Sequence, residues 1–236
     1  KLDLIYARLP LPLQHQAVTA YGLYWHWLRF GGGYKAHELA YRSRDHFNAD
    51  QWTEYQQEQL RNLIRIASEH VPYYQRTWTH EQVKAAMAGD LAALPLLEKD
   101  PIRKDPKEFV RADMRRVHYY TNYTSGSTGT PIATLWTADE IRDSLAVREV
   151  RSANWAGVSF KLPRATFSGR LVEPDPNSKG PYYRLNSVEK QVYFSPFHLR
   201  ADTAHFYVEA LKRHHIEWMT GYAVSYFLLA RFILQE

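Results

Sequence analysis

A stretch of hydroxyl-bearing and glycine residues, Thr-Asn-Tyr-Thr-Ser-Gly-Ser-Thr-Gly-Thr-Pro, occupies positions 121–131. Gly126 and Gly129 allow backbone angles and close approach that a Cβ would prevent. The hydroxyls beside them, together with successive backbone N–H groups of such a turn, form a concave site for an anion. The stretch therefore predicts a phosphate-binding loop. The residues expected to contact the phosphates are Thr124, Ser125, Gly126, Ser127, Thr128, Gly129 and Thr130.

The loop differs from the Walker motif of P-loop nucleotidases, which places a second glycine five residues and a lysine six residues after its first glycine. Counted from Gly126, these positions hold Pro131 and Ile132, so the lysine that would reach the phosphates is missing. A phosphate-binding nucleotidase of another lineage is a weaker alternative. A solvated turn without a ligand is another, because Ser/Thr/Gly-rich segments between strands are often only turns.

The elements around the loop predict an α/β fold with two regions, 1–110 and 111–236. Residues 1–110 are expected to be mainly helical, with helices at 11–29 and 35–46, a helix that starts at Asn48 or Asp50 and ends at 71, and a connector at 95–106. A capping box of Thr79 with Gln82 predicts a short helix at 79–87. Residues 111–236 carry the loop and alternate strands with helices, which is typical of an α/β layer. Strands are predicted at 117–123, 132–136, 164–167, 191–194 and 217–219, and helices at 137–154, 202–213 and 223–236.

The last predicted helix leaves an apolar face to be buried. Its apolar positions recur with helical spacing, and no Gly, Asn or Pro signal ends it before Glu236. We expect the chain to stop inside a larger protein. The residues of the predicted buried face are Ala223, Tyr226, Phe227, Ala230 and Leu234.

Composition limits the kind of protein further. The chain has 236 residues, 45% of them hydrophobic, a formal net charge of +5 and no cysteine. Basic and acidic residues alternate, so nucleic-acid binding is not expected, and the absence of thiols fits a cytoplasmic location. The aromatic segment 18–30 contains His26 and Arg29 and is predicted to pack in the protein, with contact to a membrane surface as the less favoured alternative.

Residues 124–131 match completely the octet Thr-Ser-Gly-Ser/Thr-Thr-Gly-x-Pro of the adenylate-forming (ANL) superfamily, and the chain resembles that superfamily. Its branch with phenylacetate–CoA ligases and CapK-like proteins of polysaccharide biosynthesis is closest in four further segments. These segments are Leu-Pro-Leu-Leu-Glu-Lys-Asp at 94–100, Phe-Ser-Gly-Arg at 167–170, Phe-Ser-Pro-Phe-His at 194–198 and Trp-Met-Thr-Gly-Tyr at 218–222. In the last segment Ala223 replaces a proline of the family pattern.

The resemblance implies a fold and an activity. The fold would be a helical N-terminal region packed on part of the large ANL domain, with mixed sheets and flanking helices, truncated at its C-terminus. The activity would be ATP- and Mg²⁺-dependent activation of a small-molecule carboxylate as acyl-AMP, with CoA as one candidate acceptor. His198, Gly221 and Tyr222 would line the acyl pocket.

The departures from the family leave the catalytic residues unassigned. Thr130 and Ile132 stand where many family loops carry a lysine, so Mg²⁺ or arginines would neutralise the phosphates. The other nucleotide motifs and the catalytic lysine would lie beyond Glu236, so residues 1–236 alone are expected to be inactive. A binding or scaffold protein of the same fold is the competing hypothesis. The histidines match no metal pattern, and five arginines are unranked candidates for the phosphates: Arg142, Arg148, Arg151, Arg164 and Arg170.

Overall fold

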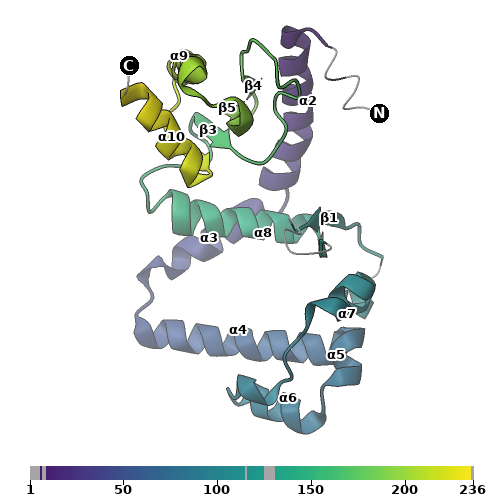
Figure 1. Ribbon diagram of the computed structural model, residues 1–236. Coiled ribbons are helices and arrows are strands. Elements are labelled where there is room, and N and C mark those ends of the chain that lie inside the picture. Colours follow the sequence, from purple (N-terminus) through teal and green to yellow (C-terminus); the bar gives the residue numbers. More distant parts are fainter. Residues whose placement is uncertain (1–5, 7–8, 115, 125–130, 235–236) are drawn as a thin grey trace. The chain divides into compact units, whose positions relative to one another are not determined.

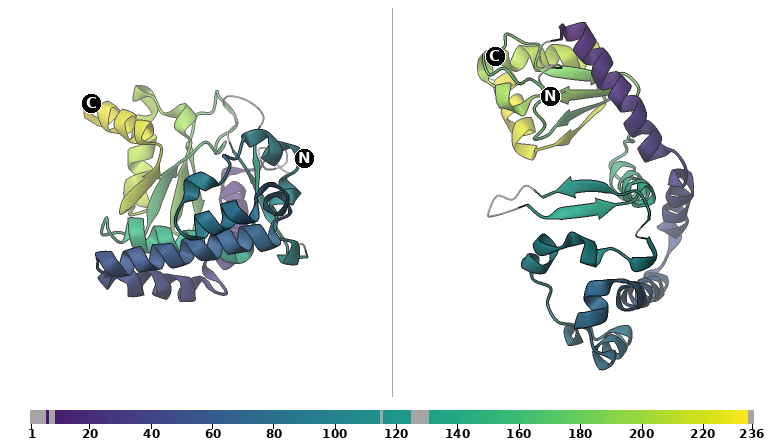
Figure 2. Two further views of the ribbon diagram at one scale, coloured as in Figure 1. Left: turned by 90° about the horizontal axis from the view of Figure 1, so that it is seen from below. Right: turned by 90° about the vertical axis from the view of Figure 1, so that its right-hand side faces the viewer.

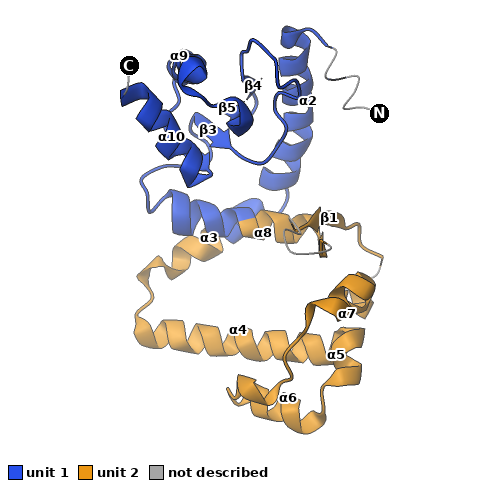
Figure 3. Cartoon of the chain, in the orientation of Figure 1, with its two compact units in different colours: residues 1–38, 145–236 blue, residues 39–144 orange. Residues whose placement is uncertain are grey.

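The computed structural model describes residues 6, 9–114, 116–124 and 131–234 (Figure 1). Its contacts divide the chain into two compact units (Figure 3). Unit 1 combines residues 1–38 with 145–236, and unit 2 comprises residues 39–144. Each unit is described by itself below, and the division into domains at residue 110 stays a prediction.

Unit 2 begins with helices, and one of them starts at a residue that was predicted as a helix start. Helix α3, Tyr34–Ser43, extends from unit 1 into unit 2, and α4, Ala49–His70, follows the cap residue Asn48. The Asn48 side chain accepts the backbone N–H of Gln51 at 2.9 Å, and the Gln51 side chain accepts the N–H of Asn48 at 2.9 Å. This reciprocal capping fixes the start of α4.

Short helices follow α4. Helix α5, Pro72–Thr77, starts at a proline, and α6, His80–Met87, has the predicted capping box of Thr79 with Gln82. The predicted connector at 95–106 contains another helix, α7, Lys99–Lys104. Pro101 lies in its first turn, where the N–H that proline lacks would have no partner in the helix. Short 3₁₀ turns occur in unit 2 at Arg44–His46, Leu91–Ala93, Pro106–Phe109 and Ala112–Met114.

A β-hairpin flanks the predicted phosphate loop. Strand β1, Tyr120–Tyr123, pairs antiparallel with β2, Ala133–Trp136. Beyond the last pair, the backbone N–H of Thr124 donates to the carbonyl oxygen of Ile132 at 3.0 Å, and the N–H of Ile132 donates to Thr124 Oγ1 at 3.0 Å. The hairpin thus confirms both predicted strands in shortened form and closes the base of the loop.

The helix predicted after β2 begins at Thr137 as expected. Glu140 N donates to Thr137 Oγ1 at 3.2 Å, and Thr137 N donates to Glu140 Oε2 at 2.6 Å. Helix α8, Ala138–Arg148, passes from unit 2 into unit 1 and continues as a π-helix, Glu149–Ala153. Buried Glu149 accepts hydrogen bonds from Ser159 Oγ at 2.6 Å and from the backbone N–H of Phe160 at 2.9 Å, which ties the π-helix to the segment that follows it.

Unit 1 contains a four-stranded mixed sheet with the order β4-β5-β3-β6 (Figure 2). Strand β3 runs parallel to β5 and β6, and β4 runs antiparallel to β5. The sequence predicted β3 and β5 with their observed bounds, predicted β6 in a shifted form and missed β4. The bounds are Arg164–Phe167 for β3, Tyr183–Asn186 for β4, Gln191–Phe194 for β5 and Trp218–Gly221 for β6.

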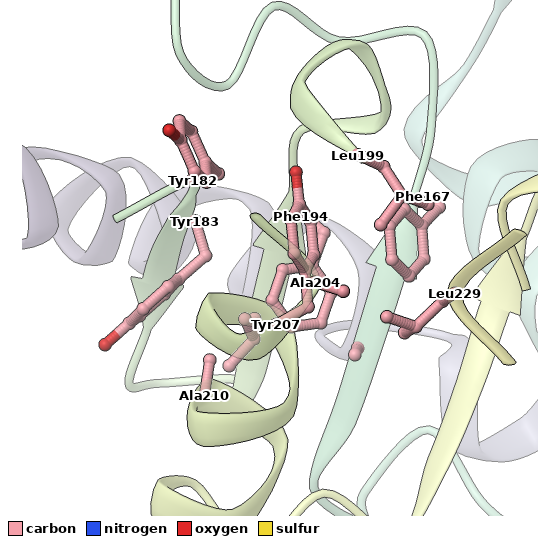
Figure 4. Packing of buried hydrophobic residues seen from close by; sticks show 11 residues of the cluster. Phe167, Tyr182, Tyr183, Phe194, Leu199, Ala204, Tyr207, Ala210 and Leu229 are labelled. Atoms are coloured by element: carbon pink, nitrogen blue, oxygen red, sulfur yellow. The ribbon is translucent and has the colours of Figure 1, made fainter. Parts of the chain in front are cut away.

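One face of this sheet forms the hydrophobic core of unit 1. Phe167 of β3 and Phe194 of β5 are fully buried, with their ring centroids 5.0 Å apart. Helix α9, Ala204–Arg213, covers them with Tyr207, and α10, Ala223–Leu234, contributes Leu229 (Figure 4). Burying each aromatic ring stabilises the unit by roughly 1.5–3 kcal/mol. Short 3₁₀ turns at Pro196–His198 and Ala201–Thr203 lead from β5 into α9.

The predicted buried face of α10 is partly wrong. Tyr226 packs against the core as expected, whereas Phe227 and Leu234 are 65% and 85% exposed. The helix buries Leu229 and Ser225 instead. The helix carries apolar side chains all around its circumference, so helical spacing alone does not identify the side that packs on the sheet.

The other face of the sheet is polar, and α2, Leu11–Phe30, packs on its edge strand β4. His15 Nδ1 accepts the backbone N–H of Leu185 at 3.0 Å. Thr19 Oγ1 accepts the N–H of Ser187 at 3.2 Å and lies 3.3 Å from the carbonyl oxygen of Leu185. His15 and Thr19 thus give α2 polar contacts with β4, whereas the aromatic Tyr21 and Trp27 are 59% and 62% exposed. Among the described residues, no helix combines the length and the apolar character needed to cross a bilayer.

Candidate functional site

An arginine-lined cavity of about 450 Å³ lies on the polar face of the unit 1 sheet. It reaches the carboxyl ends of β3 and β6, where open α/β sheets commonly bind ligands. Arg29 and Phe30 come from the end of α2, Leu145 and Arg148 from α8, and the remaining residues from the sheet and its loops. The latter are Phe160, Arg164, Thr166, Phe167, Ser168, Arg170, Gln191, Tyr193, Thr220, Gly221 and Tyr222.

Two arginines that line this cavity, Arg164 and Arg29, belong to a buried ion-pair network. Arg164 Nη2 lies 2.5 Å from Glu189 Oε2 and 2.8 Å from Gln191 Oε1, and the side chains of Arg164 and Glu189 are 3% and 1% exposed. Arg29 Nη1 approaches the same Glu189 carboxylate at 3.3 Å. Burial lowers the pKa of the Arg164 guanidinium from its usual value, and Glu189 opposes this shift. Two guanidinium groups thus share one carboxylate.

Two further arginines of the cavity have aromatic neighbours in place of acidic ones. The Arg148 guanidinium lies over the Phe160 ring at 5.3 Å from its centroid, and that of Arg170 lies over the Tyr193 ring at 5.4 Å. Within the described part of the chain, neither arginine forms an ion pair, and no acidic residue lines the cavity. An aromatic face orients a guanidinium without cancelling its charge. The cavity therefore suits an anionic ligand.

The structure brings two of the three predicted acyl-pocket residues, Gly221 and Tyr222, to this cavity. Gly221 has a φ of +132°, and the N–H of Tyr222 donates to the carbonyl oxygen of Phe167 at 3.1 Å. The Tyr222 hydroxyl oxygen lies 3.0 Å from the position that a Cβ on Gly169 would take. The absence of a side chain at Gly169 therefore leaves room for the Tyr222 hydroxyl next to the turn after β3.

The third predicted pocket residue, His198, does not line the cavity. Its ring is buried, with Nδ1 2.8 Å from Ser195 Oγ and Nε2 2.9 Å from the carbonyl oxygen of Asp175. The ring also stacks on Tyr182 at a centroid distance of 4.9 Å. These contacts tie together three chain segments, and they leave neither ring nitrogen open to a ligand.

The predicted phosphate loop is described only at its base. Ser125–Thr130 lie outside the described residues. Thr124 is described, and its hydroxyl accepts the N–H of Ile132, so it contributes to the closure of the hairpin. Among the residues that the structure describes, no three His, Cys, Asp or Glu side chains are grouped to hold a metal ion.

The five arginines predicted as phosphate ligands differ in whether they line the cavity. Arg148, Arg164 and Arg170 line it, whereas Arg142 and Arg151 do not. Sequence reasoning missed Arg29, which belongs to a helix more than a hundred residues before the other three. The sequence marked Arg29 only as a basic residue near the end of a predicted aromatic helix. Gln191 and Tyr193 were also missed, although their strand was predicted.

Comparisons with known proteins give one distant relative to report. The chain is 24% identical to Protein CapK of Staphylococcus aureus over 153 aligned residues. The alignment covers 65% of this chain and 33% of that protein. The aligned part thus spans about a third of that relative's length. No protein-family model and no solved structure matches the chain. The comparison supports a CapK-like relationship.

Proposed function

We propose that the protein containing this chain is an ATP-dependent, adenylate-forming enzyme. A carboxylate oxygen of the substrate would attack the α-phosphorus of ATP, and the bond between that phosphorus and the bridging oxygen of the β-phosphate would break. The products would be acyl-AMP and pyrophosphate. The resemblance to CapK-like proteins of polysaccharide biosynthesis favours a role in that process.

The observation that carries this proposal is the uncompensated charge of the arginine-lined cavity. Four arginines contribute to the cavity and one glutamate pairs with two of them, which leaves three positive charges for a ligand. Fixed guanidinium groups bind carboxylates with charge-assisted hydrogen bonds and need little reorganisation when the ligand arrives. We assign the carboxylate of the substrate to Arg148 and Arg170, because these two have no carboxylate partner among the described residues.

The nucleotide is assigned to residues 124–130, on the complete match of the octet. Their N–H groups and hydroxyls would hold the β- and γ-phosphates of ATP, which enters as its Mg²⁺ complex. Mg²⁺ would supply charge neutralisation in place of the missing loop lysine. The role predicted for His198 in the acyl pocket has no support from its contacts.

The proposal is tested with Gly126→Val in the full-length protein. The branched side chain should block the close approach of phosphate, so calorimetry should show loss of Mg·ATP binding while the circular dichroism spectrum is unchanged. Thr121→Val is the matched control on the same hairpin, since it keeps a β-branched residue outside the octet. Equal ATP affinity in the folded Gly126→Val variant would refute the loop assignment.

A second experiment separates the enzyme from the competing scaffold hypothesis, which the absence of a lysine at Thr130 and Ile132 favours. Acid-dependent exchange of labelled pyrophosphate into ATP is measured with a panel of carboxylic acids. Exchange that requires one class of acid supports adenylate formation. ATP binding without exchange for any acid would instead support a nucleotide-binding protein without turnover.

A further inference from the structure

A second cavity of about 490 Å³ adjoins the arginine-lined cavity and shares three of its residues, Arg29, Arg170 and Tyr193. It lies between α2 and the polar face of the sheet, and apolar and aromatic side chains make up most of its wall. The residues found in this second cavity alone are Tyr6, Ala17, Val18, Tyr21, Gly22, Trp25, Leu171, Val172, Arg184 and Asn186.

Arg184 and Asn186 of this wall are already bonded within the protein, whereas the buried Trp25 Nε1 has no hydrogen-bond partner among the described residues. Arg184 Nε donates to Gln14 Oε1 at 2.6 Å, and Arg184 Nη2 donates to Glu173 Oε2 at 3.0 Å. Asn186 Oδ1 accepts the N–H of Glu189 at 3.4 Å. Arg170 therefore remains as the shared cation without a carboxylate partner among the described residues. The second cavity offers apolar surface next to a single available positive charge.

We propose that the second cavity binds the apolar body of the acid whose carboxylate is held by Arg170. This inference rests on the proposed function and names its substrate class: a monocarboxylic acid with an apolar group larger than one benzene ring, such as a fused-ring aryl acid. The carboxylate would project into the arginine-lined cavity, and the rings would lie against Val18, Trp25 and Val172.

The size of the cavity is the reason for a large group. A cavity of about 150 Å³ in a protein core accommodates benzene, and the second cavity has about three times that volume. A single ring would leave much of the apolar wall in contact with water, whereas a fused pair of rings would cover more of it and gain affinity in proportion to the apolar area buried.

Two alanines on α2 provide a matched pair of variants. Ala17 lines the second cavity, whereas Ala20 lies on the exposed side of the same helix. Ala17→Phe should fill the cavity and Ala20→Phe should not, although both make the same change in helix propensity. Naphthylacetate and propionate serve as the large and small acids, with pyrophosphate exchange and calorimetry as separate readouts.

We expect Ala17→Phe to raise the KM for naphthylacetate by about tenfold or more and to leave the KM for propionate unchanged, while Ala20→Phe changes neither. Leu171→Ala, in an exposed loop, is a second variant that should weaken naphthylacetate binding with little risk to folding. Equal effects of both phenylalanine variants, or wild-type binding of naphthylacetate no tighter than propionate, would overturn the inference.

The same readouts distinguish failure of the inference from failure of the proposed function. Calorimetric binding of naphthylacetate that is lost in Ala17→Phe, with no pyrophosphate exchange in any variant, would support the cavity and refute adenylate formation. Exchange that depends on acids of every size equally would support adenylate formation and refute the cavity.

Discussion

A Cβ on Gly221 would lie 1.7 Å from the carbonyl oxygen of Phe167 on the neighbouring strand β3. The two residues are register partners at the carboxyl ends of β6 and β3, and both line the arginine-lined cavity. The φ of +132° at Gly221 is also one that side-chain-bearing residues rarely adopt. The close approach of these two backbones therefore shapes the edge of the cavity.

Gly221→Ala is expected to destabilise unit 1 by about 3 kcal/mol or more, since backbone strain and steric overlap act together. Gly157→Ala is the control. Gly157 also has a positive φ, of +74°, but no atom lies within 4 Å of the position of its Cβ. Gly157→Ala should therefore lower the free energy of unfolding only through backbone strain, by about 1–2 kcal/mol. Urea unfolding measures the free energy of unfolding of both variants. Equal losses of stability would show that the overlap of the new Cβ with Phe167 is relieved at little cost.

Glu189→Gln is expected to lower the free energy of unfolding by about 3–5 kcal/mol, because it leaves the buried Arg164 guanidinium without its counter-charge. The double variant Arg164→Met/Glu189→Leu should recover most of that loss by removing both charges. Asp202→Asn is the control, since Asp202 pairs with Arg200 on the exposed surface and should leave the unfolding midpoint in place. A small effect of Glu189→Gln would mean that Arg164 keeps access to solvent or to another anion.

Stability should decrease on acidification below pH about 6.5 because of His15 and His214. Burial lowers the pKa of both, and the charges of Arg184 and Arg213 add to the shifts of His15 and His214 respectively. The unfolded chain therefore takes up protons first, near the ordinary pKa of about 6.5. The stabilisation is complete above that pH and is lost as the pH falls through the lower folded-state values.

Urea unfolding between pH 7.5 and 5 checks this dependence. His15→Gln should reduce the slope of stability against pH, because His15 Nδ1 must stay unprotonated to accept the N–H of Leu185. His205→Gln, at an exposed position of α9, is the control. An unchanged slope in His15→Gln would assign the acid sensitivity to His214 or to other groups.

The parts of the fold that were predictable are those with local signals. Thr137 was predicted as a helix start and Asn48 as one of two alternative starts, and the structure confirms both, with caps that Gln51 and Glu140 complete. Strand β4 was missed because its buried side carries Arg184 and Asn186, which are 3% and 2% exposed. Alternation of apolar and polar residues does not identify a strand whose polar side chains are buried against another element.

The candidate site shows the same limit. Gly221 and Tyr222 were predicted from a local motif and do line a cavity. Which arginines join them depends on tertiary contacts, because Glu189 neutralises part of the charge of Arg164 and Arg29 but not that of Arg170. His198 was predicted from its neighbours Pro196 and Phe197, whereas its contacts with Ser195 and Asp175 appear only in the folded chain.

Arg170→Met should weaken binding of an aromatic carboxylate by about tenfold to a hundredfold, the loss expected for one charge-assisted hydrogen bond of about 1.5–3 kcal/mol. Calorimetry with naphthylacetate measures this effect, and added salt should reduce the wild-type affinity more than that of the variant. Arg200→Met is the matched control, because Arg200 is exposed, pairs with Asp202 and lines neither cavity.

Tyr193→Leu tests how Arg170 is held in place. The variant keeps the charge and an apolar side chain but removes the aromatic face beneath the guanidinium, so it should weaken binding by about threefold to tenfold, in line with a cation–π energy of about 0.5–1 kcal/mol or more. Retained affinity in Tyr193→Leu together with loss in Arg170→Met would show that the charge acts without the ring. Retained affinity in Arg170→Met itself would place the carboxylate elsewhere, with Arg148 as the next candidate, since it too has no ion-pair partner among the described residues.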